Sequence, residues 1–305
     1  MLLYLLWLAQ VKGIGPVSIR KLLDKFKNPE AIYRADKDQL LSVEGIGAST
    51  ASALKTSRSL DKAKKILEFS EQKKINILTC LDKAYPKELL DNNKAPAVLY
   101  YLGAAPRKGG VAIIGSRKCS DYGKKVACDT AAFLAGYDIP VISGMATGID
   151  GYAHTSCLKA GGYTLAFLGG GADTCFPKEH YSLKQAIIEK GTVISQFPPG
   201  TSPQPAHFPR RNYLMAAWAR QIVVVEAAEN SGALITAEYG WDLQRPVYAV
   251  PGSIYSKLSR GSHALLTRGA ELFTNPGQLL HKKNTAKEAF QDWKPPDVFA
   301  GTSDS

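Results

Sequence analysis

One short segment combines basic, amide and aromatic side chains in a way that suits nucleic acid. It runs from Phe208 through Pro, Arg210, Arg211 and Asn212 to Tyr213, and it leads into a run with helical spacing. Arginines neutralise phosphates, asparagine forms hydrogen bonds, and the flanking rings offer surfaces on which bases stack. The segment predicts contact with a single-stranded nucleic acid, and the competing interpretation is a basic turn exposed to water.

Three glycine-containing loops also carry chemistry that suits a phosphorylated ligand. In Gly115-Ser116-Arg117 the glycine allows close approach of a backbone, while the hydroxyl and the guanidinium suit a phosphate. The loop around Gly144 opens a helix whose amides could hold a phosphate. The Gly-Gly-Gly loop centred on Gly170 leaves room for a ligand and is followed by a lysine. For the first loop, a plain strand-to-helix turn with an exposed arginine is the alternative.

Asp150 and His154 raise the question of acid–base catalysis. They stand four residues apart, which places them on one face of a helix. The spacing is compatible with proton transfer, but a helix-capping aspartate with a neighbouring histidine explains it more simply. We therefore favour a structural role for both.

The elements that must position these loops are strands and helices in alternation. Short β-branched runs, such as Val111–Ile114, Val141–Ser143, Tyr163–Leu168 and Ile222–Val225, are each followed by glycines and a helix-like stretch. This alternation predicts βαβ units around a parallel sheet, and therefore the α/β fold class. Because ligands of an open parallel sheet bind beyond the carboxyl ends of its strands, the loops are expected to lie together.

The N-terminal region differs from the rest and contains a repeat. The sequence from Val11 to Gly15 and that from Val43 to Gly47 share the pattern apolar-x-Gly-apolar-Gly, and each precedes a helical stretch. The pattern resembles the helix-hairpin-helix motif, whose backbone amides can hold a phosphate at a helix N-terminus. We expect a small all-α domain over residues 1–83, and whether its hairpins bind DNA or only connect helices stays open.

Composition and charge narrow the choice of function. The chain has 305 residues, of which 45% are hydrophobic and 21% charged, as in a globular protein with a full core. Its longest apolar stretch is far shorter than the ~20 residues that span a bilayer, so we expect a cytoplasmic protein without membrane contact. Five cysteines without a C-x-x-C pair indicate neither a disulfide framework nor a zinc site. The net charge of +11 favours a polyanionic partner.

An ordered set of motifs makes the chain similar to the DprA/Smf family of DNA-processing proteins. The motifs are Gly-Ser-Arg, Ser-Gly-x-Ala-x-Gly-Ile-Asp-x-x-Ala-His, the Gly-Gly-Gly loop, Phe-Pro-Arg-Arg-Asn, Ser-Gly-Ala-Leu-Ile-Thr-Ala, Ala-Val-Pro-Gly and Gly-Ser-x-x-Leu-x-x-x-Gly-Ala. The resemblance covers residues 1–281. It implies a SAM-like helical domain at 1–83, followed at 84–281 by an extended Rossmann-like domain that binds DNA and forms a homodimer. Many relatives continue into a winged-helix domain, and residues 282–305 are expected to be a tail too short for one.

The resemblance also implies a function and a set of site residues. Such a protein binds and protects incoming single-stranded DNA and loads the RecA recombinase during natural transformation, without enzymatic activity or a cofactor. The matching pocket positions in this sequence are Arg117, Lys178, Arg210, Arg211 and Asn212, together with the loop residues Gly115, Ser116, Gly144 and Gly170.

This sequence departs from the usual family pattern at four places. Thr147 stands where an arginine is frequent, His180 and His263 stand where asparagine is usual, and Tyr213 replaces a common arginine. These changes lower the positive charge expected in the pocket.

Two other classes of function compete with the DNA-binding mediator. One is an enzyme of the lysine-decarboxylase-like phosphoribohydrolase type, with Glu238 as its acid–base group. Against it, the Pro-Gly-Gly-x-Gly-Thr-x-x-Glu signature is missing, and no nucleophile–base pair, metal cluster or Walker motif is found. The other is a protein-interaction module. For the dimer surface, Leu265–Phe273 is the candidate segment.

Overall fold

The computed structural model describes residues 1–280, and its N-terminal region is helical. Six helices follow one another there, α1 (Leu2–Gln10), α2 (Pro16–Phe26), α3 (Pro29–Arg34), α4 (Lys37–Leu41), α5 (Ala48–Thr56) and α6 (Asp61–Gln72). The two hairpins of the repeat lie directly before α2 and α5. Gly13 and Gly45 have φ angles of +83° and +80°, a conformation that glycine adopts without strain. The expected helical bundle with two hairpins is confirmed.

A nine-stranded sheet forms the centre of the remaining chain. Its order is β1-β2-β6-β5-β4-β3-β7-β8-β9, and all neighbours from β6 to β9 are parallel. The strands are β1 (Asn76–Thr79), β2 (Val98–Gly103), β3 (Val111–Ile114), β4 (Val141–Ser143), β5 (Thr164–Phe167), β6 (Thr192–Ser195), β7 (Gln221–Val224), β8 (Val247–Ala249) and β9 (Glu271–Leu272). The predicted α/β class with a mainly parallel sheet is confirmed.

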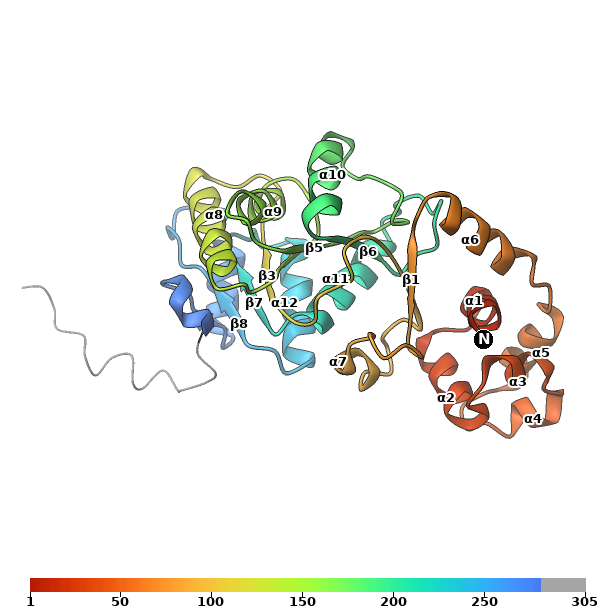
Figure 1. Cartoon of the computed structure of the whole chain (residues 1–305). Helices are drawn as coiled ribbons and strands as arrows, with labels where there is room; N and C mark the ends of the chain where they lie inside the picture. The colour runs from red at the N-terminus through yellow and green to blue at the C-terminus, as the bar shows by residue number, and fades with distance from the viewer. Residues whose placement is uncertain (281–305) are drawn as a thin grey trace, which may run out of the picture.

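Helices cover both faces of this sheet (Figure 1). On one face lie α8 (Asp121–Gly136), α9 (Ile149–Lys159) and α10 (Tyr181–Lys190), and on the other lie α11 (His207–Trp218) and α12 (Gly232–Asp242). The central strands β3 to β6 are buried over their whole length, as the apolar runs require when both faces are covered. Short helices α7 (Lys87–Leu90) and α13 (Arg260–Thr267) and the 3-10 turns η1 (Lys178–His180) and η2 (Pro276–Leu280) complete the fold.

The junction between the two regions differs from the sequence-based expectation. Asn76–Thr79, expected within the helical region, forms the outer strand β1, which pairs antiparallel with β2. β2 in turn pairs antiparallel with β6. Unlike the strands recognised in the sequence, this segment is not followed by glycines and a helix-like stretch, which explains why the sequence did not indicate it. A domain division at residue 83 stays a prediction, and the tail expected at 282–305 lies outside the described residues.

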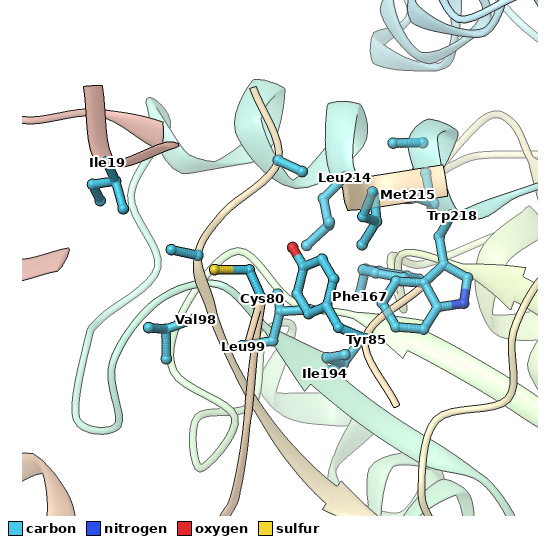
Figure 2. Packing of buried hydrophobic residues seen from close by; sticks show 14 of the residues in the cluster. Ile19, Cys80, Tyr85, Val98, Leu99, Phe167, Ile194, Leu214, Met215 and Trp218 are labelled. Atoms are coloured by element: carbon cyan, nitrogen blue, oxygen red, sulfur yellow. The ribbon is translucent and has the colours of Figure 1, made fainter. Parts of the chain in front are cut away.

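A layer of large apolar side chains fixes α11 against the sheet (Figure 2). Leu214, Met215 and Trp218 of α11 are buried, and the Trp218 ring meets Phe167 of β5 edge-on with 5.6 Å between centroids. Tyr85, from the segment that joins the two regions, is buried in the same layer and donates its hydroxyl hydrogen to the Pro96 carbonyl. The basic segment at the start of α11 is therefore attached to a rigid support.

Two classes of feature are missing from the part of the chain that the structure describes. Over residues 1–280, no helix has the length and apolar character needed to cross a membrane. Within the same range, no cluster of histidine, cysteine, aspartate and glutamate side chains has the arrangement of a metal site.

Candidate nucleic-acid interface

The loops singled out in the sequence meet at one edge of the sheet. The Gly115–Arg117 loop follows β3, the Gly144 loop follows β4, the Gly169–Gly171 loop follows β5, and α11 begins after the loop that follows β6. Since β3 to β6 are parallel neighbours, all four connections leave from the carboxyl ends of adjacent strands. The expected convergence of the loops is confirmed.

Phe208, in the first turn of α11, is the point at which these loops come together. The guanidinium carbon of Arg117 lies 6.0 Å from the centroid of the Phe208 ring, and that of Arg211 lies 5.8 Å from it. Phe176, from the loop after β5, approaches the same ring with 5.8 Å between centroids. Gly169 allows this packing, because a Cβ there would lie 2.9 Å from the Phe208 ring.

Three of the expected basic residues are exposed around this centre. Arg117 lies in the loop after β3, Lys178 in η1, and Arg210 in the first turn of α11. Arg210 extends over the ring of Phe197, with 5.2 Å between its guanidinium carbon and the ring centroid. Cations held on aromatic rings keep their charge toward solvent while their stems are supported. The structure thus brings together Arg117, Lys178 and Arg210 at one edge of the sheet.

Arg211 differs from its neighbour, because it is buried beneath the loops. Only 6% of it is exposed, and its Nη1 donates a hydrogen bond of 3.1 Å to the Phe167 carbonyl. Among residues 1–280, its buried Nε has no hydrogen-bond partner. Burial lowers the pKa of Arg211, and the nearby Asp150 carboxylate opposes that shift. The structure therefore places Arg211 beneath the loops, and its role as a DNA contact stays a prediction.

The close approach of this buried arginine leaves no space for a side chain at Gly144. A Cβ at Gly144 would lie 1.5 Å from Nη1 of Arg211, so any side chain there would displace the guanidinium. Gly170 is also enclosed, because a Cβ there would lie 2.8 Å from the Thr201 carbonyl oxygen. Both glycines make room for protein atoms, and their contact with a ligand stays a prediction.

Asn212 and Ser116 likewise form bonds within the protein. Asn212 is 8% exposed and donates from Nδ2 to the Gly232 carbonyl at 3.3 Å, which joins α11 to the start of α12. The Ser116 hydroxyl donates to the Lys118 carbonyl at 2.8 Å and closes its own turn. Gly115 packs closely over Ile149 at the start of α9. These residues shape the loops that carry the exposed cations.

Asp150 and His154 are both buried, as a structural role requires, but Asp150 does not cap α9, whose N-cap residue is Gly148. Oδ2 of Asp150 accepts hydrogen bonds from the amides of Gly144 and Ala146 at 3.1 and 3.3 Å. Burial raises its pKa, while Arg211 and these amides oppose the shift. His154 is fully buried, its Nδ1 lies 2.6 Å from Oγ1 of Thr164, and burial lowers its pKa to about 3. Neither side chain is accessible for proton transfer to a ligand.

Two exposed aromatic residues of the interface escaped the sequence analysis. Phe176 and Tyr181 flank Lys178, and they are 49% and 61% exposed. Exposed aromatic rings beside a lysine are the side chains on which unpaired bases stack. The signal was present in the sequence as two aromatic residues within three positions of Lys178.

A buried lysine supports the loop that carries these rings. Lys184 of α10 is 3% exposed, and its Nζ donates to the Thr174 carbonyl at 2.8 Å. Burial lowers the pKa of Lys184. Sequence reasoning did not separate Lys184 from the exposed lysines, because lysine side chains are almost never fully buried.

The departures from the family pattern have local partners in this structure. Nδ1 of His180 lies 3.1 Å from the Met145 carbonyl, and Nε2 of His263 lies 3.1 Å from the Gly252 carbonyl. The hydroxyl of Tyr213 donates to Oδ1 of Asn92 at 2.8 Å. Thr147 is half-buried in the loop before α9. The polar contacts of His180, His263 and Tyr213 therefore hold neighbouring loops.

Glu238, the acid–base candidate of the enzyme hypothesis, does not join the Phe208 cluster. It is exposed on α12, and its Oε1 accepts a hydrogen bond of 3.0 Å from Nη1 of Arg268. That ion pair involves residues that follow β7 and β8 rather than the loops after β3 to β6.

Comparison with known families and proteins gives a consistent result. Residues 76–284 match the family described as DNA recombination-mediator protein A, and residues 6–57 match the SAM-like helix-hairpin-helix tandem. Protein Smf of Synechocystis sp. is 36% identical over 282 residues, which cover 90% of this chain and 71% of that protein.

Two solved structures show the same similarity. DNA processing protein A from Streptococcus pneumoniae superposes with a TM-score of 0.81 at 30% identity, covering 93% of this chain and 99% of that one. DNA processing protein A from Helicobacter pylori, described as having a distinctive single-stranded DNA binding mode, superposes with a TM-score of 0.60 at 25% identity. This superposition covers 68% of this chain and 94% of the Helicobacter pylori chain. The chain therefore belongs to the DNA recombination-mediator protein A family, the DprA/Smf family of DNA-processing proteins.

Proposed function

We propose that this protein binds single-stranded DNA at the carboxyl edge of its sheet and acts as a non-catalytic recombination mediator. The observation that carries the proposal is the group of exposed cations and rings around Phe208. Arg117, Lys178 and Arg210 would neutralise phosphates, and Phe176 and Tyr181 would stack on bases. The Helicobacter pylori relative supports the choice of ligand, since it is described as binding single-stranded DNA.

The geometry favours unpaired over duplex DNA. A base can lie against an exposed ring only when its face is free, and in a duplex neighbouring bases occupy that face. Arginines near aromatic rings add cation–π contacts to the same surface. Preference for a single strand is thus expected from the side chains alone.

The partners follow from the family rather than from a contact in this structure. We propose that the bound strand is protected and then transferred to the RecA recombinase during natural transformation, which would take place in the cytoplasm. We also propose a homodimer formed through the Rossmann-like domain. The candidate segment Leu265–Phe273 includes the outer strand β9, where Leu272 is 48% exposed.

The proposal is tested by fluorescence anisotropy of a labelled strand of about 20 nucleotides and of the matching duplex, each at two salt concentrations. We expect preferential binding of the single strand. A plot of the logarithm of the binding constant against the logarithm of the salt concentration should have a slope about 0.7 less steep for Arg117→Ala than for the wild type. Arg220→Ala is the matched control, because Arg220 is exposed but precedes β7 at the opposite edge of the sheet. Equal binding by wild type and Arg117→Ala would overturn the proposal.

A further inference from the structure

A second pairing of a lysine with an aromatic ring lies beside the Arg117 loop. Lys124 in the first turn of α8 holds its Nζ 5.0 Å from the ring centroid of Tyr152, in the first turn of α9. Lys124 is exposed, whereas Tyr152 is half-buried and packs against the apolar layer beneath α8 and α9. Neither residue belongs to the group around Phe208.

Tyr152 is attached closely to the loop that carries Arg117. The amide of Ile149 donates to the Ser116 carbonyl at 3.2 Å, and a Cβ at Gly148 would lie 2.7 Å from the Arg117 carbonyl oxygen. Tyr152 follows Gly148 by four residues, so it lies one helical turn beyond this contact.

The charges along this surface are mainly positive. Lys118 follows Arg117 directly and is exposed. Among residues 1–280, Lys124 has no carboxylate within 4.0 Å, whereas its neighbour Lys125 pairs with Asp129 at 2.9 Å. The loop after β3 and the first turn of α8 thus carry the exposed cations Arg117, Lys118 and Lys124, with Asp121 as the exposed acidic residue between them.

We propose that Lys124 and Tyr152 form a second platform for single-stranded DNA, which extends the binding track beyond Arg117. The inference rests on the proposed function and concerns the part of a strand that leaves the Phe208 group. On binding, the flexible Lys124 side chain moves from the ring to a phosphate, and the uncovered face of Tyr152 receives a base. The positive charges of these side chains complement the phosphates of the DNA strand. The contacts between the start of α9 and the Arg117 loop place the second platform next to the first.

The test compares a short strand of about 6 nucleotides, which fills only the Phe208 group, with a long strand of about 20 nucleotides, which reaches α8. Anisotropy titrations use the full chain and the variants Lys124→Ala, Tyr152→Ala, Tyr152→Phe and Arg117→Ala. We expect Lys124→Ala and Tyr152→Ala to weaken binding of the long strand about three- to tenfold and to leave the short strand unchanged. Tyr152→Phe keeps the ring and should retain the affinity of the wild type.

Lys125→Ala is the matched control, because Lys125 is the adjacent exposed lysine but is paired with Asp129. It should bind both strands as the wild type does. For the long strand, Lys124→Ala should also make the dependence of the logarithm of the binding constant on the logarithm of the salt concentration about 0.7 less steep, as expected for one lost phosphate contact. Because Tyr152 contributes to packing, its variants are checked by thermal unfolding, whereas Lys124→Ala changes only an exposed side chain.

The possible failures are distinguishable. If Arg117→Ala weakens both strands while Lys124→Ala binds the long strand like the wild type, the second platform is wrong and the proposed function stands. If Lys124→Ala weakens both strands equally, the lysine belongs to the Phe208 group and the extension is wrong. If Arg117→Ala changes neither strand, the proposed function itself fails.

Discussion

The interface has an outer and an inner layer whose basic residues have opposite roles, although two of them are adjacent in the chain. In the outer layer, Arg117, Lys178 and Arg210 are exposed and have few partners in the protein. In the inner layer, Arg211 is buried beside Asp150 and donates to a strand carbonyl. The difference shows that adjacent arginines of one motif can have different structural roles, because Arg210 is exposed to solvent whereas Arg211 supports the loops from beneath.

The largest expected effect follows from removing the charge of the inner arginine. Arg211→Met leaves the buried Asp150 carboxylate without its nearby cation, and we expect the free energy of unfolding to fall by about 3–5 kcal/mol. Urea denaturation measures the loss. Arg210→Met is the matched control and should change stability by no more than about 0.5 kcal/mol while weakening DNA binding. Equal losses in the two variants would contradict the division into layers.

Acid should destabilise the inner layer through His154. Its pKa of about 3 in the folded protein is below the ordinary value near 6.5. When the pH falls below 6.5, His154 therefore binds a proton in the unfolded chain but stays neutral in the folded protein. Above pH 6.5 its contribution to stability is complete, and it falls by about 1.4 kcal/mol per pH unit as the pH drops toward 3.

Asp150 acts in the opposite direction, because its raised pKa means that the folded protein binds a proton more readily than the unfolded chain. The contribution of His154 is therefore isolated by comparing wild type with His154→Gln in urea denaturation at several pH values. The variant should lose stability less steeply between pH 6.5 and 4. Parallel pH profiles would show that His154 does not titrate as expected.

A smaller loss is expected when Gly144 gains a side chain. Gly144→Ala places a methyl group on the Arg211 guanidinium, and overpacking of this kind costs about 1–3 kcal/mol. Thermal or urea unfolding measures it. Gly136→Ala is a suitable comparison, because a Cβ there meets no atom within 4 Å. An unchanged stability of Gly144→Ala would mean that Arg211 can move aside without loss.

The smallest effect on the folded protein, with a clear effect on binding, is expected in the outer layer. Tyr181→Ala removes an exposed ring, so stability should stay within about 0.5 kcal/mol of the wild type. Affinity for a single strand should fall by about 1–3 kcal/mol, the usual contribution of one stacked base. Tyr181→Phe should bind like the wild type, and a loss of stability without a loss of affinity would place Tyr181 in the inner layer.

Much of the fold was predictable, because strand ends, glycine loops and helical spacing are local patterns. The burial of Arg211 had a signal that was not used: Leu214, Met215 and Trp218 follow it by three, four and seven residues, which places Arg211 on the apolar stripe of α11. Gly170 could not be assigned in this way. Gly170 is enclosed by the backbone of Thr201, which lies in a different loop, between β6 and α11.

The close fit between Gly144 and Arg211 also bears on how sequences in this family can change. A larger residue at 144 is acceptable only after the arginine has gone, and the loss of the arginine first leaves the buried Asp150 without its nearby cation. Both single-step routes pass through a less stable protein, so the pair should be exchanged together or not at all. Exposed positions such as Lys178 make no such contact, so they can change one residue at a time without this loss of stability.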